Sequence, residues 1–170
     1  MKLVVAVDQE WGIGYQGGLL AYVKADLAHF KELTVGKTVI LGSTTLKTFP
    51  GGRPLKNRKN LILSRNPDFA PEGATVLRSV EELLCYQNAH PEEELVVIGG
   101  ASVYRQLLPY CDTAYVAHFE QSFEKDTYFP DLSKDEQWQC VESGPQLYSK
   151  GETDTIDGMP YRFAEYRRIR

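Results

Sequence analysis

Four short apolar runs constrain the fold of this 170-residue chain more than any other feature. The runs are Leu3-Val4-Val5-Ala6-Val7, Thr38-Val39-Ile40-Leu41, Asn60-Leu61-Ile62-Leu63 and Leu95-Val96-Val97-Ile98. Continuous apolar runs with β-branched residues are typical of strands buried on both faces, and helical patterns lie between them. The sequence therefore predicts an α/β fold with a central mixed, mostly parallel β-sheet of about eight strands, flanked by about four helices.

The last third of the chain has a different pattern. Residues 113–119 alternate weakly, as in a strand, and residues 126–130 have the composition of a turn. Residues 137–142 and 161–167 alternate like antiparallel strands with one face in water, so we expect an antiparallel C-terminal hairpin. Because no linker or internal repeat divides the chain, residues 1–170 are predicted to form a single domain.

Composition excludes several classes of protein. No apolar run approaches the roughly 18 residues of a membrane helix, and the N-terminal apolar block is too short for a signal peptide. Cys85, Cys111 and Cys140 are odd in number and far apart, which favours neither a disulfide framework nor a zinc site. We therefore expect a cytoplasmic protein with no membrane partner and no metal.

A basic band lies between Leu33 and Pro67, where seven basic residues occur without an acidic one. The rest of the chain has 12 of the 19 basic residues and all 23 acidic ones. A basic band on an acidic protein indicates a local anionic partner, whereas a solvated face is the common alternative, and composition leaves both open. The basic residues are Lys37, Lys47, Arg53, Lys56, Arg58, Lys59 and Arg65.

Asp26 is placed unusually in a predicted amphipathic helix that begins near Lys24. At about 100° per residue, it falls on the apolar arc with Val23, Phe30 and Leu33. An ionised carboxylate among apolar side chains is costly unless a partner hydrogen-bonds it. Either Asp26 caps the helix N-terminus, or its partner is a ligand, an amine-rich ring that docks against the helix.

Three segments have the composition of ligand-binding turns. Residues 12–18 contain four glycines and predict a mobile loop that passes close to a ligand. Gly99 and Gly100 follow a buried strand and lead directly into a helix, a geometry that lets the backbone approach a diphosphate. The hydroxyl residues 43–45 are equally suited to capping a short helix and to binding phosphate. A further helix is predicted from a capping box at residues 79–82 to about residue 89.

Motifs in this order and at these spacings are similar to those of dihydrofolate reductases, and the similarity covers nearly the whole chain. The matching pieces are Ala6-Val7-Asp8 with Ile13-Gly14, Ala25-Asp26-Leu27-Ala28-His29-Phe30-Lys31, Val39-Ile40-Leu41-Gly42, Arg53-Pro54-Leu55 with Arg58-Lys59-Asn60, Leu63-Ser64-Arg65, Val97-Ile98-Gly99-Gly100-Ala101-Ser102-Val103-Tyr104, and Phe123-Glu124-Lys125-Asp126-Thr127-Tyr128-Phe129-Pro130.

The resemblance implies reduction of dihydrofolate to tetrahydrofolate, with hydride transfer from NADPH to C6 and protonation at N5. Asp26 is then the acid that hydrogen-bonds the pterin, with a pKa raised by desolvation, and Leu19 completes the catalytic set. Arg58 binds the glutamate carboxylate through two N–H groups. The implied substrate-binding residues are Val4, Val5, Ala6, Asp26, Leu27, Phe30, Phe49, Leu55, Arg58, Ile98 and Tyr104.

The same resemblance implies an NADPH site in which the Gly-Gly peptide is cis. Residues 13, 14 and 19 border the nicotinamide, and residues 99–104 hold the diphosphate. Thr44 and Thr45 bind phosphate, and Ser64 with Arg65 binds the adenosine 2′-phosphate. The implied cofactor-binding residues are Ala6, Ile13, Gly14, Leu19, Gly42, Thr44, Thr45, Leu63, Ser64, Arg65, Ile98, Gly99, Gly100, Ala101, Ser102, Val103, Tyr104 and Thr127.

Four positions depart from the family pattern. The Pro-Trp pair before the acid-bearing helix is here Leu20-Ala21, and the strand threonine that hydrogen-bonds the acid is Ala117. Ser43 replaces a basic residue, and Leu46 replaces an aromatic one. Because the first two departures lie next to the chemistry, we expect a working reductase that is slow or has altered antifolate binding.

Two alternatives remain beside the reductase. A paralogue of the same fold could reduce another pterin or a pyrimidine intermediate, although Arg58 and Phe30 suit the tail of dihydrofolate. A non-catalytic nucleotide-binding or RNA-binding module could use the basic band, although such a surface usually interleaves aromatic residues. His29 and His118 have no second ligand at a metal-binding spacing. We expect a monomer whose partners are dihydrofolate and NADPH, and no nucleic acid.

Overall fold

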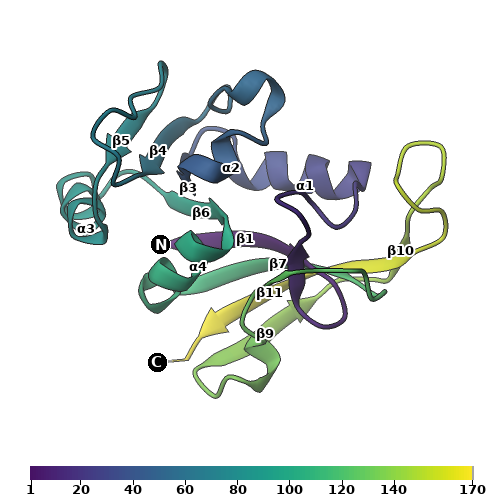
Figure 1. Cartoon of the computed structure of the whole chain (residues 1–170). Helices are drawn as coiled ribbons and strands as arrows, with labels where there is room; N and C mark the ends of the chain where they lie inside the picture. The colour runs from purple at the N-terminus through teal and green to yellow at the C-terminus, as the bar shows by residue number, and fades with distance from the viewer. Residues whose placement is uncertain (170) are drawn as a thin grey trace. The chain divides into compact units, whose positions relative to one another are not determined.

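The computed structural model describes residues 1–169, in which strands alternate with helices as the apolar runs predict (Figure 1). Contacts divide the chain into two compact units. The first unit comprises Met1–Leu3 and Thr34–Tyr110, and the second comprises Val4–Leu33 and the chain from Cys111 onward. The expectation of a single domain over residues 1–170 stays a prediction.

Parallel strands form the sheet of the first unit. The start of β1 (Lys2–Val7) pairs with β6 (Leu95–Gly99), β6 with β3 (Thr38–Gly42), β3 with β4 (Lys59–Leu63), and β4 with β5 (Thr75–Leu77). All of these pairings are parallel, and the central strands are almost fully buried. The apolar runs are therefore confirmed as strands covered on both faces.

Short helices connect the strands of the first unit. They are α2 (Ser43–Leu46), η1 (Pro50–Gly52), α3 (Val80–Ala89), α4 (Ala101–Leu107) and η2 (Leu108–Tyr110). Figure 1 shows α3 beside β5, and α4 leads on directly from β6. The predicted helices are confirmed at α2, α3 and α4, whereas the short 3₁₀ turns η1 and η2 were not predicted.

The predicted capping box at the start of α3 is half confirmed. The Ser79 hydroxyl accepts a hydrogen bond from the backbone N–H of Glu82 at 3.1 Å, as an N-cap does. The Glu82 carboxylate accepts from the N–H of Arg78 at 2.8 Å, one residue before the N-cap. Both donors at the helix start are therefore satisfied, although the second bond differs from the capping-box pattern.

Antiparallel strands dominate the second unit. The remainder of β1 lies beside β7 (Thr113–Phe119), and β7 pairs with β11 (Pro160–Arg168). The other neighbours of β11 are β9 (Trp138–Ser143) and β10 (Leu147–Tyr148), also antiparallel. β9, β11 and β7 run side by side in Figure 1. The mixed α/β fold with antiparallel C-terminal strands is thus confirmed.

Three short strands of the second unit were not predicted, namely β10 and the pair formed by β2 and β8. β2 (Gly12–Gly14) lies in the expected glycine loop, and β8 (Thr127–Tyr128) lies in the expected turn at residues 126–130. They pair antiparallel, and the flanking N–H of Phe129 donates to the Trp11 carbonyl at 2.8 Å. The prediction was wrong here because strands of two or three residues contain too little pattern to show a period.

The remaining α-helix of residues 1–169 is α1 (Lys24–Thr34). All of α1 except Thr34 belongs to the second unit. A 3₁₀ turn, η3 (Leu132–Lys134), precedes β9. Four α-helices match the predicted number. The core below α1 contains Ala21, Val23, Ala117, Phe119, Met159 and Tyr161.

Candidate functional site

A loop from the C-terminal part of the second unit caps the start of α1. The N–H of Lys24 donates to the Asp154 carboxylate at 2.8 Å. The N–H of Tyr22 donates to the Thr155 hydroxyl at 2.8 Å, and the Thr155 N–H donates back to the Tyr22 carbonyl at 2.9 Å. Asp26 is the third residue of α1. Asp154 thus fills the capping role, and the capping alternative for Asp26 is wrong.

The Asp26 carboxyl group is partly buried and receives no hydrogen bond from residues 1–169. Burial raises its pKa to about 6, because removing water disfavours the charged form. Leu27 and Phe30, on the same helix, are also only partly buried. The helix therefore presents a carboxyl group with unused hydrogen-bonding capacity beside apolar side chains.

Small and aromatic side chains form a buried cluster next to the start of α1, with Val23 as a member. Ala21 and Ala117 are both buried in the cluster that contains Tyr161, and Ala6 packs against this cluster. The His29 ring stacks on Phe163 with 4.1 Å between centroids, and burial lowers the His29 pKa. His29 is thus a packed histidine, as expected for one without a second metal ligand.

A buried network fixes the beginning of the glycine-rich segment. The Asp8 carboxylate accepts hydrogen bonds from the N–H groups of Glu10 and Gly12, both at 2.9 Å. Its other oxygen accepts from Lys125 Nζ at 2.8 Å and from the Phe123 N–H at 3.1 Å. This network anchors β2, which carries the predicted cofactor-binding residues 13 and 14. Sequence reasoning missed the roles of Asp8 and Lys125.

In the first unit, the diglycine turn lies against α2. The peptide bond between Gly99 and Gly100 is cis, as the resemblance implies, and Gly99 has a φ of 130°. A Cβ atom on Gly100 would lie 3.2 Å from the Thr45 hydroxyl. Glycine at residue 100 therefore keeps this approach free of a tight contact, and a turn without side chains lets the backbone come close to a diphosphate group. The residues present fit the cofactor.

The hydroxyl residues of α2 do not cap it. Gly42 is the N-cap of α2, and no side chain accepts a hydrogen bond from the helix start. The expectation that residues 43–45 cap this helix is wrong, because the helix begins at Ser43 itself. Within residues 1–169, the Thr44 and Thr45 hydroxyls are not used as caps, which leaves phosphate binding as the open alternative.

A further missed residue, Arg78, holds the loop that carries Ser64 and Arg65. Its guanidinium group donates to the carbonyl oxygens of Ser64 at 3.4 Å and Phe69 at 3.2 Å, and also to that of Asn66. Arg65 itself is exposed. The loop is thus fixed by one arginine and presents another to solvent. The sequence gives no local sign that these two arginines differ.

Arg58 is held by its neighbours in the first unit. Its Nε donates to the Lys56 carbonyl at 2.8 Å and its Nη1 to the Thr34 hydroxyl at 3.0 Å. Burial lowers the pKa of Arg58, but a guanidinium group stays charged at neutral pH. The second terminal nitrogen is not used in these bonds, so the side chain is oriented and still able to bind a carboxylate.

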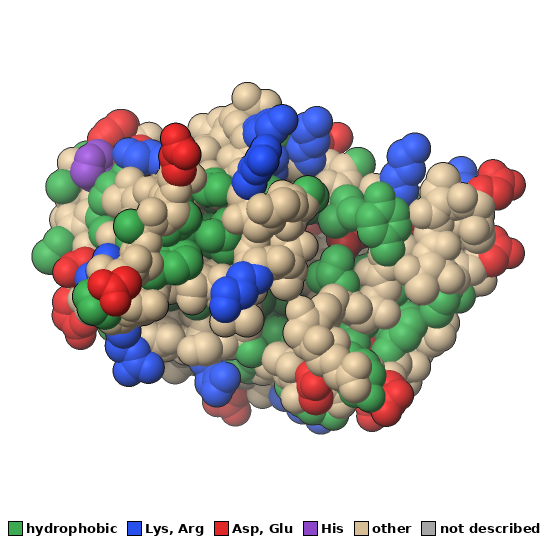
Figure 2. Space-filling model, turned by 45° about the horizontal axis from the view of Figure 1, so that its top comes forward, with side chains coloured by type: hydrophobic (Ala, Val, Ile, Leu, Met, Phe, Trp, Pro, Cys, Tyr) green, Lys and Arg blue, Asp and Glu red, His purple; other side chains and the backbone are tan. Residues whose placement is uncertain are grey.

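The basic band is partly neutralised within the first unit. Lys37 pairs with Glu94 at 3.2 Å, and Lys59 pairs with Glu93 at 3.5 Å. Figure 2 shows several Lys and Arg side chains close together at the top of the view. The band is therefore in part a set of ordinary surface ion pairs, and the cations that remain suit a small anionic ligand.

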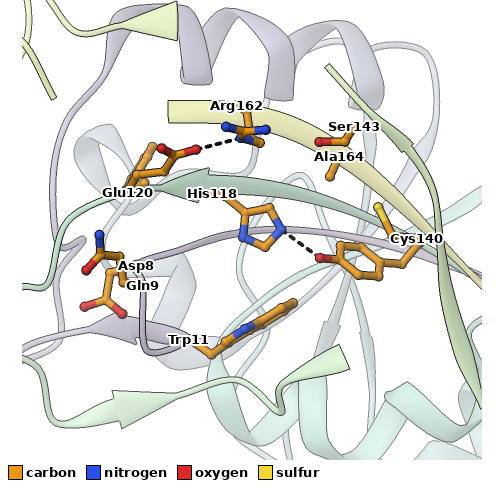
Figure 3. Close-up of a pocket in the computed structure, with 11 residues that line it drawn as sticks. Asp8, Gln9, Trp11, His118, Glu120, Cys140, Ser143, Arg162 and Ala164 are labelled. Atoms are coloured by element: carbon orange, nitrogen blue, oxygen red, sulfur yellow. Dashed lines mark hydrogen bonds and ion pairs between the residues drawn. The ribbon is translucent and has the colours of Figure 1, made fainter. Parts of the chain in front are cut away.

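A separate cavity of about 290 Å³ lies on the other face of the β7–β11 pair (Figure 3). His118 and Tyr166 meet there at 2.9 Å, and Arg162 pairs with Glu120 at 2.6 Å. His118 follows Ala117 on β7, so the two side chains point to opposite faces. No predicted site residue lines this cavity.

The structure distributes the predicted site residues between the two units. The second unit holds Val4, Val5, Ala6, Ile13, Gly14, Leu19, Asp26, Leu27, Phe30 and Thr127. The first unit holds Gly42, Thr44, Thr45, Phe49, Leu55, Arg58, Leu63, Ser64, Arg65 and residues 98–104. Leu19 is exposed, whereas Tyr104 is buried beside Gly99.

Two features are absent from residues 1–169. No group of three or more His, Cys, Asp or Glu side chains is placed to hold a metal ion. No helix in this part of the chain has the length and apolar character needed to cross a membrane.

The α/β fold, the half-buried acid and the diglycine turn are the parts of a dinucleotide-dependent enzyme that acts on a nitrogen-rich ring. A family model for dihydrofolate reductase matches residues 1–168. The chain therefore belongs to the dihydrofolate reductase family, and its activity is the NADPH-dependent reduction of dihydrofolate.

Individual relatives agree with this assignment. The dihydrofolate reductase of Bacillus subtilis (strain 168) is 33% identical over 168 residues, covering 99% of this chain and 94% of that protein. The dihydrofolate reductase of Mycobacterium leprae (strain TN) is 38% identical over 160 residues, covering 92% and 90%. A solved structure of Enterococcus faecalis dihydrofolate reductase, complexed with NADP(H) and RAB-propyl, is similar with a TM-score of 0.86 at 34% identity, covering 99% of this chain and 96% of that one.

Proposed function

We propose that Asp26 binds the pterin ring of dihydrofolate and controls the proton that reaches N5. The observation that carries this role is a half-buried carboxyl group with no hydrogen-bond partner in residues 1–169 and a pKa raised to about 6 by burial. A carboxylate in this setting is stabilised by the amino and ring N–H groups of a pterin. Leu27 and Phe30 supply apolar contact to the rings.

Asp26 acts on the proton through its charge and its hydrogen bonds. NADPH supplies the hydride that is transferred to C6 of the substrate. The Asp26 pKa of about 6 is close to neutral pH, so the carboxyl group can both accept and release a proton there. We propose that it favours protonation at N5 through a water molecule, without contacting that atom. Leu19, which is exposed, borders the nicotinamide.

Arg58 is proposed to bind the glutamate carboxylate of dihydrofolate. The bonds from Nε to Lys56 and from Nη1 to Thr34 restrict the guanidinium group before substrate arrives. A restricted guanidinium loses less conformational entropy when it binds a carboxylate through two N–H groups. Phe49 and Leu55, both partly buried, belong to the proposed substrate-binding set.

The first unit is proposed to bind most of the cofactor. Its proposed ligands for the diphosphate are the backbone at Gly99 and Gly100 and the hydroxyls of Thr44 and Thr45. Arg65, exposed on the loop that Arg78 holds, is the proposed ligand of the 2′-phosphate, with Ser64. A guanidinium group binds phosphate well, so Arg65 supports the preference for NADPH over NADH.

We also propose that the enzyme works as a cytoplasmic monomer without a nucleic-acid partner. The partial neutralisation of the basic band by Glu93 and Glu94 supports the absence of a nucleic-acid surface. Binding to RNA would fall steeply with salt, so a salt series with a labelled RNA tests this part of the proposal.

Steady-state kinetics of Asp26→Asn test the central proposal. We expect kcat/KM for dihydrofolate to fall by about 100-fold or more at pH 7.5, since asparagine cannot take up the proton and carries no charge. Glu32→Gln is the matched control, because Glu32 lies on the same helix and is exposed. An Asp26→Asn variant as fast as the parent would overturn the proposed role.

Comparison of dihydrofolate with a dihydropterin that lacks the aminobenzoyl-glutamate tail tests the substrate. The parent enzyme should favour dihydrofolate by at least about tenfold in kcat/KM, and Arg58→Gln should remove most of that preference. Equal use of both compounds by the parent would instead support the paralogue that reduces another pterin.

A further inference from the structure

Tyr161 lies on the face of β11 that is turned toward α1. Its side chain is 5% exposed and packs in the buried cluster with Ala21 and Ala117. It carries the only hydroxyl group among the six buried members of that cluster. Tyr161 thus supplies the one polar side-chain group in a buried cluster that otherwise consists of apolar side chains.

Contacts between aromatic rings connect Tyr161, through Phe163 and His29, to the side of α1 that carries Asp26. Asp26 and His29 are three residues apart and therefore share one side of the helix. His29 stacks on Phe163, and Phe163 meets Tyr161 edge to face with 5.7 Å between centroids. Because Tyr161 and Phe163 are two residues apart on β11, both side chains point to this same side.

The capping loop places Tyr161 near the first turn of α1 rather than farther along it. Asp154 and Thr155, which bind the N–H groups of Lys24 and Tyr22, lie only a few residues before β11. Besides burial, the charges of Asp154 and Asp26 raise the Tyr161 pKa. Tyr161 is therefore close enough to Asp26 for its charge to be felt, although the two side chains form no direct hydrogen bond.

Neither side chain is used elsewhere in the protein. Within residues 1–169, the Tyr161 hydroxyl and the Asp26 carboxyl group have no hydrogen-bond partner, and no buried side-chain nitrogen or oxygen atom is left unsatisfied. Both groups must therefore reach solvent. The two groups form no direct hydrogen bond, and both are accessible to solvent. They are therefore suited to bind one water molecule between them.

We propose that Tyr161 is a positioning residue for the reduction, whose hydroxyl orients a water molecule against the Asp26 carboxylate. This inference rests on the proposed role of Asp26. The water accepts a hydrogen bond from Tyr161 and donates one to Asp26. The proton that reaches N5 leaves this water and is replaced from solvent, so Tyr161 keeps its own proton throughout and no group is oxidised or reduced in this step.

The other titratable groups around Tyr161 have separate roles. Asp154, from the capping loop, already accepts from the N–H groups of Lys24 and Lys150. His29, from α1, is stacked on Phe163. The neighbouring part of β7 contributes Ala117 and Phe119, which do not titrate. Of the described groups facing this place, only Asp26 and Tyr161 remain to share a water.

Tyr161→Phe tests the proposal, because it keeps the ring and removes the hydroxyl. We expect kcat at saturating substrates to fall by about three- to tenfold at pH 7.5, the effect of losing one hydrogen bond, with KM for NADPH unchanged. The apparent pKa of the kcat profile should rise by about half a unit, since the carboxylate loses a donor that stabilises its charged form.

Two further variants separate a positioning role from a structural one. Tyr166→Phe removes the hydroxyl of a tyrosine on the opposite face of β11, and its pH profile should match that of the parent. In the Asp26→Asn background, Tyr161→Phe should cause no further loss of kcat, since Tyr161 acts through Asp26. A Tyr161→Phe profile that superimposes on the parent profile, or full additivity with Asp26→Asn, would overturn the proposal.

The outcomes also separate this inference from the proposed function. If Asp26→Asn keeps parental kcat/KM, the role of Asp26 fails and the inference fails with it. If Asp26→Asn is impaired while Tyr161→Phe is parental in rate and pH profile, the role of Asp26 stands and the inference alone fails.

Discussion

The Lys125 ammonium group and the Asp8 carboxylate form an ion pair at 2.8 Å, in which Lys125 is 5% and Asp8 0% exposed at the side chain. Lys125 also pairs with Glu10 at 2.6 Å. A Cβ atom on Gly12 would lie 2.0 Å from the Lys125 side chain, so glycine at residue 12 makes room for the lysine. This pair joins the start of the glycine-rich segment to residues 121–128, which lie more than one hundred positions later.

The first prediction concerns acid stability through Asp8. Burial opposes ionisation of Asp8, but hydrogen bonds from Lys125 and from three backbone N–H groups hold its pKa below the usual value. A lowered pKa in the folded state stabilises the protein above the unfolded pKa of about 3.9, and this stabilisation is lost as pH falls through the folded value. Asp8→Asn should therefore lower Tm at pH 7 by about 5 °C or more.

Thermal unfolding followed by circular dichroism from pH 7 down to pH 3 measures this effect. The gap in Tm between the parent and Asp8→Asn should begin to narrow below about pH 4, where Asp8 becomes protonated in the unfolded chain, and narrow further as the folded carboxylate is protonated at its lower pKa. Asp68→Asn, at an exposed position in the first unit, should leave Tm unchanged at each pH. A gap that stays constant with pH would show that charge on Asp8 is not the cause.

The second prediction is that Asp26 costs stability in the enzyme without ligands. Burial raises the Asp26 pKa from 3.8 to about 6, because the folded protein favours the neutral carboxyl group. The stability that this neutral group contributes is complete below the unfolded pKa and is lost as pH rises through 6. At pH 8, Asp26→Asn should raise the free energy of unfolding by up to about 3 kcal/mol, and below pH 4 by nearly nothing. Urea unfolding of the ligand-free variants at both pH values measures this; equal stability at pH 8 would contradict it.

The α/β fold was predictable because buried strands and amphipathic helices leave periodic patterns of several residues each. The inward position of Asp26 was predictable for the same reason. Asp154 was not, since it binds the N–H of Lys24 across a separation of 130 positions, and neither residue carries a local sign of the other. The roles of Arg78 and Lys125 were hidden likewise, because each depends on carbonyl or carboxylate groups that only the folded chain brings together.

The third prediction concerns Asp154 as the cap of α1. Asp154→Ala removes the acceptor of the Lys24 and Lys150 N–H groups, bonds of 2.8 and 2.7 Å. We expect a loss of about 1 kcal/mol in the free energy of unfolding, the usual cost of a lost cap. Because the first turn of α1 carries Asp26, KM for dihydrofolate should rise more than KM for NADPH.

The control for the cap lies in the same loop. The Asp157 carboxylate accepts from the Gly151 N–H at 2.8 Å, and none of its hydrogen bonds reaches α1. Asp157→Ala should therefore lower stability without changing the ratio of the two KM values. If both variants raise KM for dihydrofolate equally, loop order as a whole, and not the cap, would control α1.

The fourth prediction tests the proposed diphosphate site of the first unit, formed by the turn at Gly99 and Gly100 with Thr44 and Thr45. A methyl group on Gly100 would lie 3.2 Å from the Thr45 hydroxyl, a tight contact that displaces the hydroxyl of a proposed phosphate ligand. Gly100→Ala should therefore raise KM for NADPH by about tenfold or more, while KM for dihydrofolate changes little and serves as the internal control. Parallel increases in both KM values would indicate general distortion instead.

The last prediction concerns Ala117, which stands where the family pattern has a threonine. Ala117 is 5% exposed and belongs to the cluster with Tyr161, so a new hydroxyl at this position would lie beneath the end of α1 that carries Asp26. Ala117→Thr should raise kcat by about two- to fivefold, because the carboxyl group gains a neutral hydrogen-bond partner. It should also lessen the loss caused by Tyr161→Phe, since each hydroxyl can orient the same water.

Ala117→Val separates the hydroxyl from its bulk, because valine has nearly the shape of threonine without the oxygen atom. We expect Ala117→Val to lower stability by about 1 kcal/mol or more through overpacking and to leave kcat at or below the parental value. Ala21→Trp adds an indole at the other departure from the family pattern, and the same kinetic assay applies to it. If neither Ala117→Thr nor Ala21→Trp increases kcat, the two alanines do not limit the rate, and the expectation of a slow reductase drawn from these two departures fails.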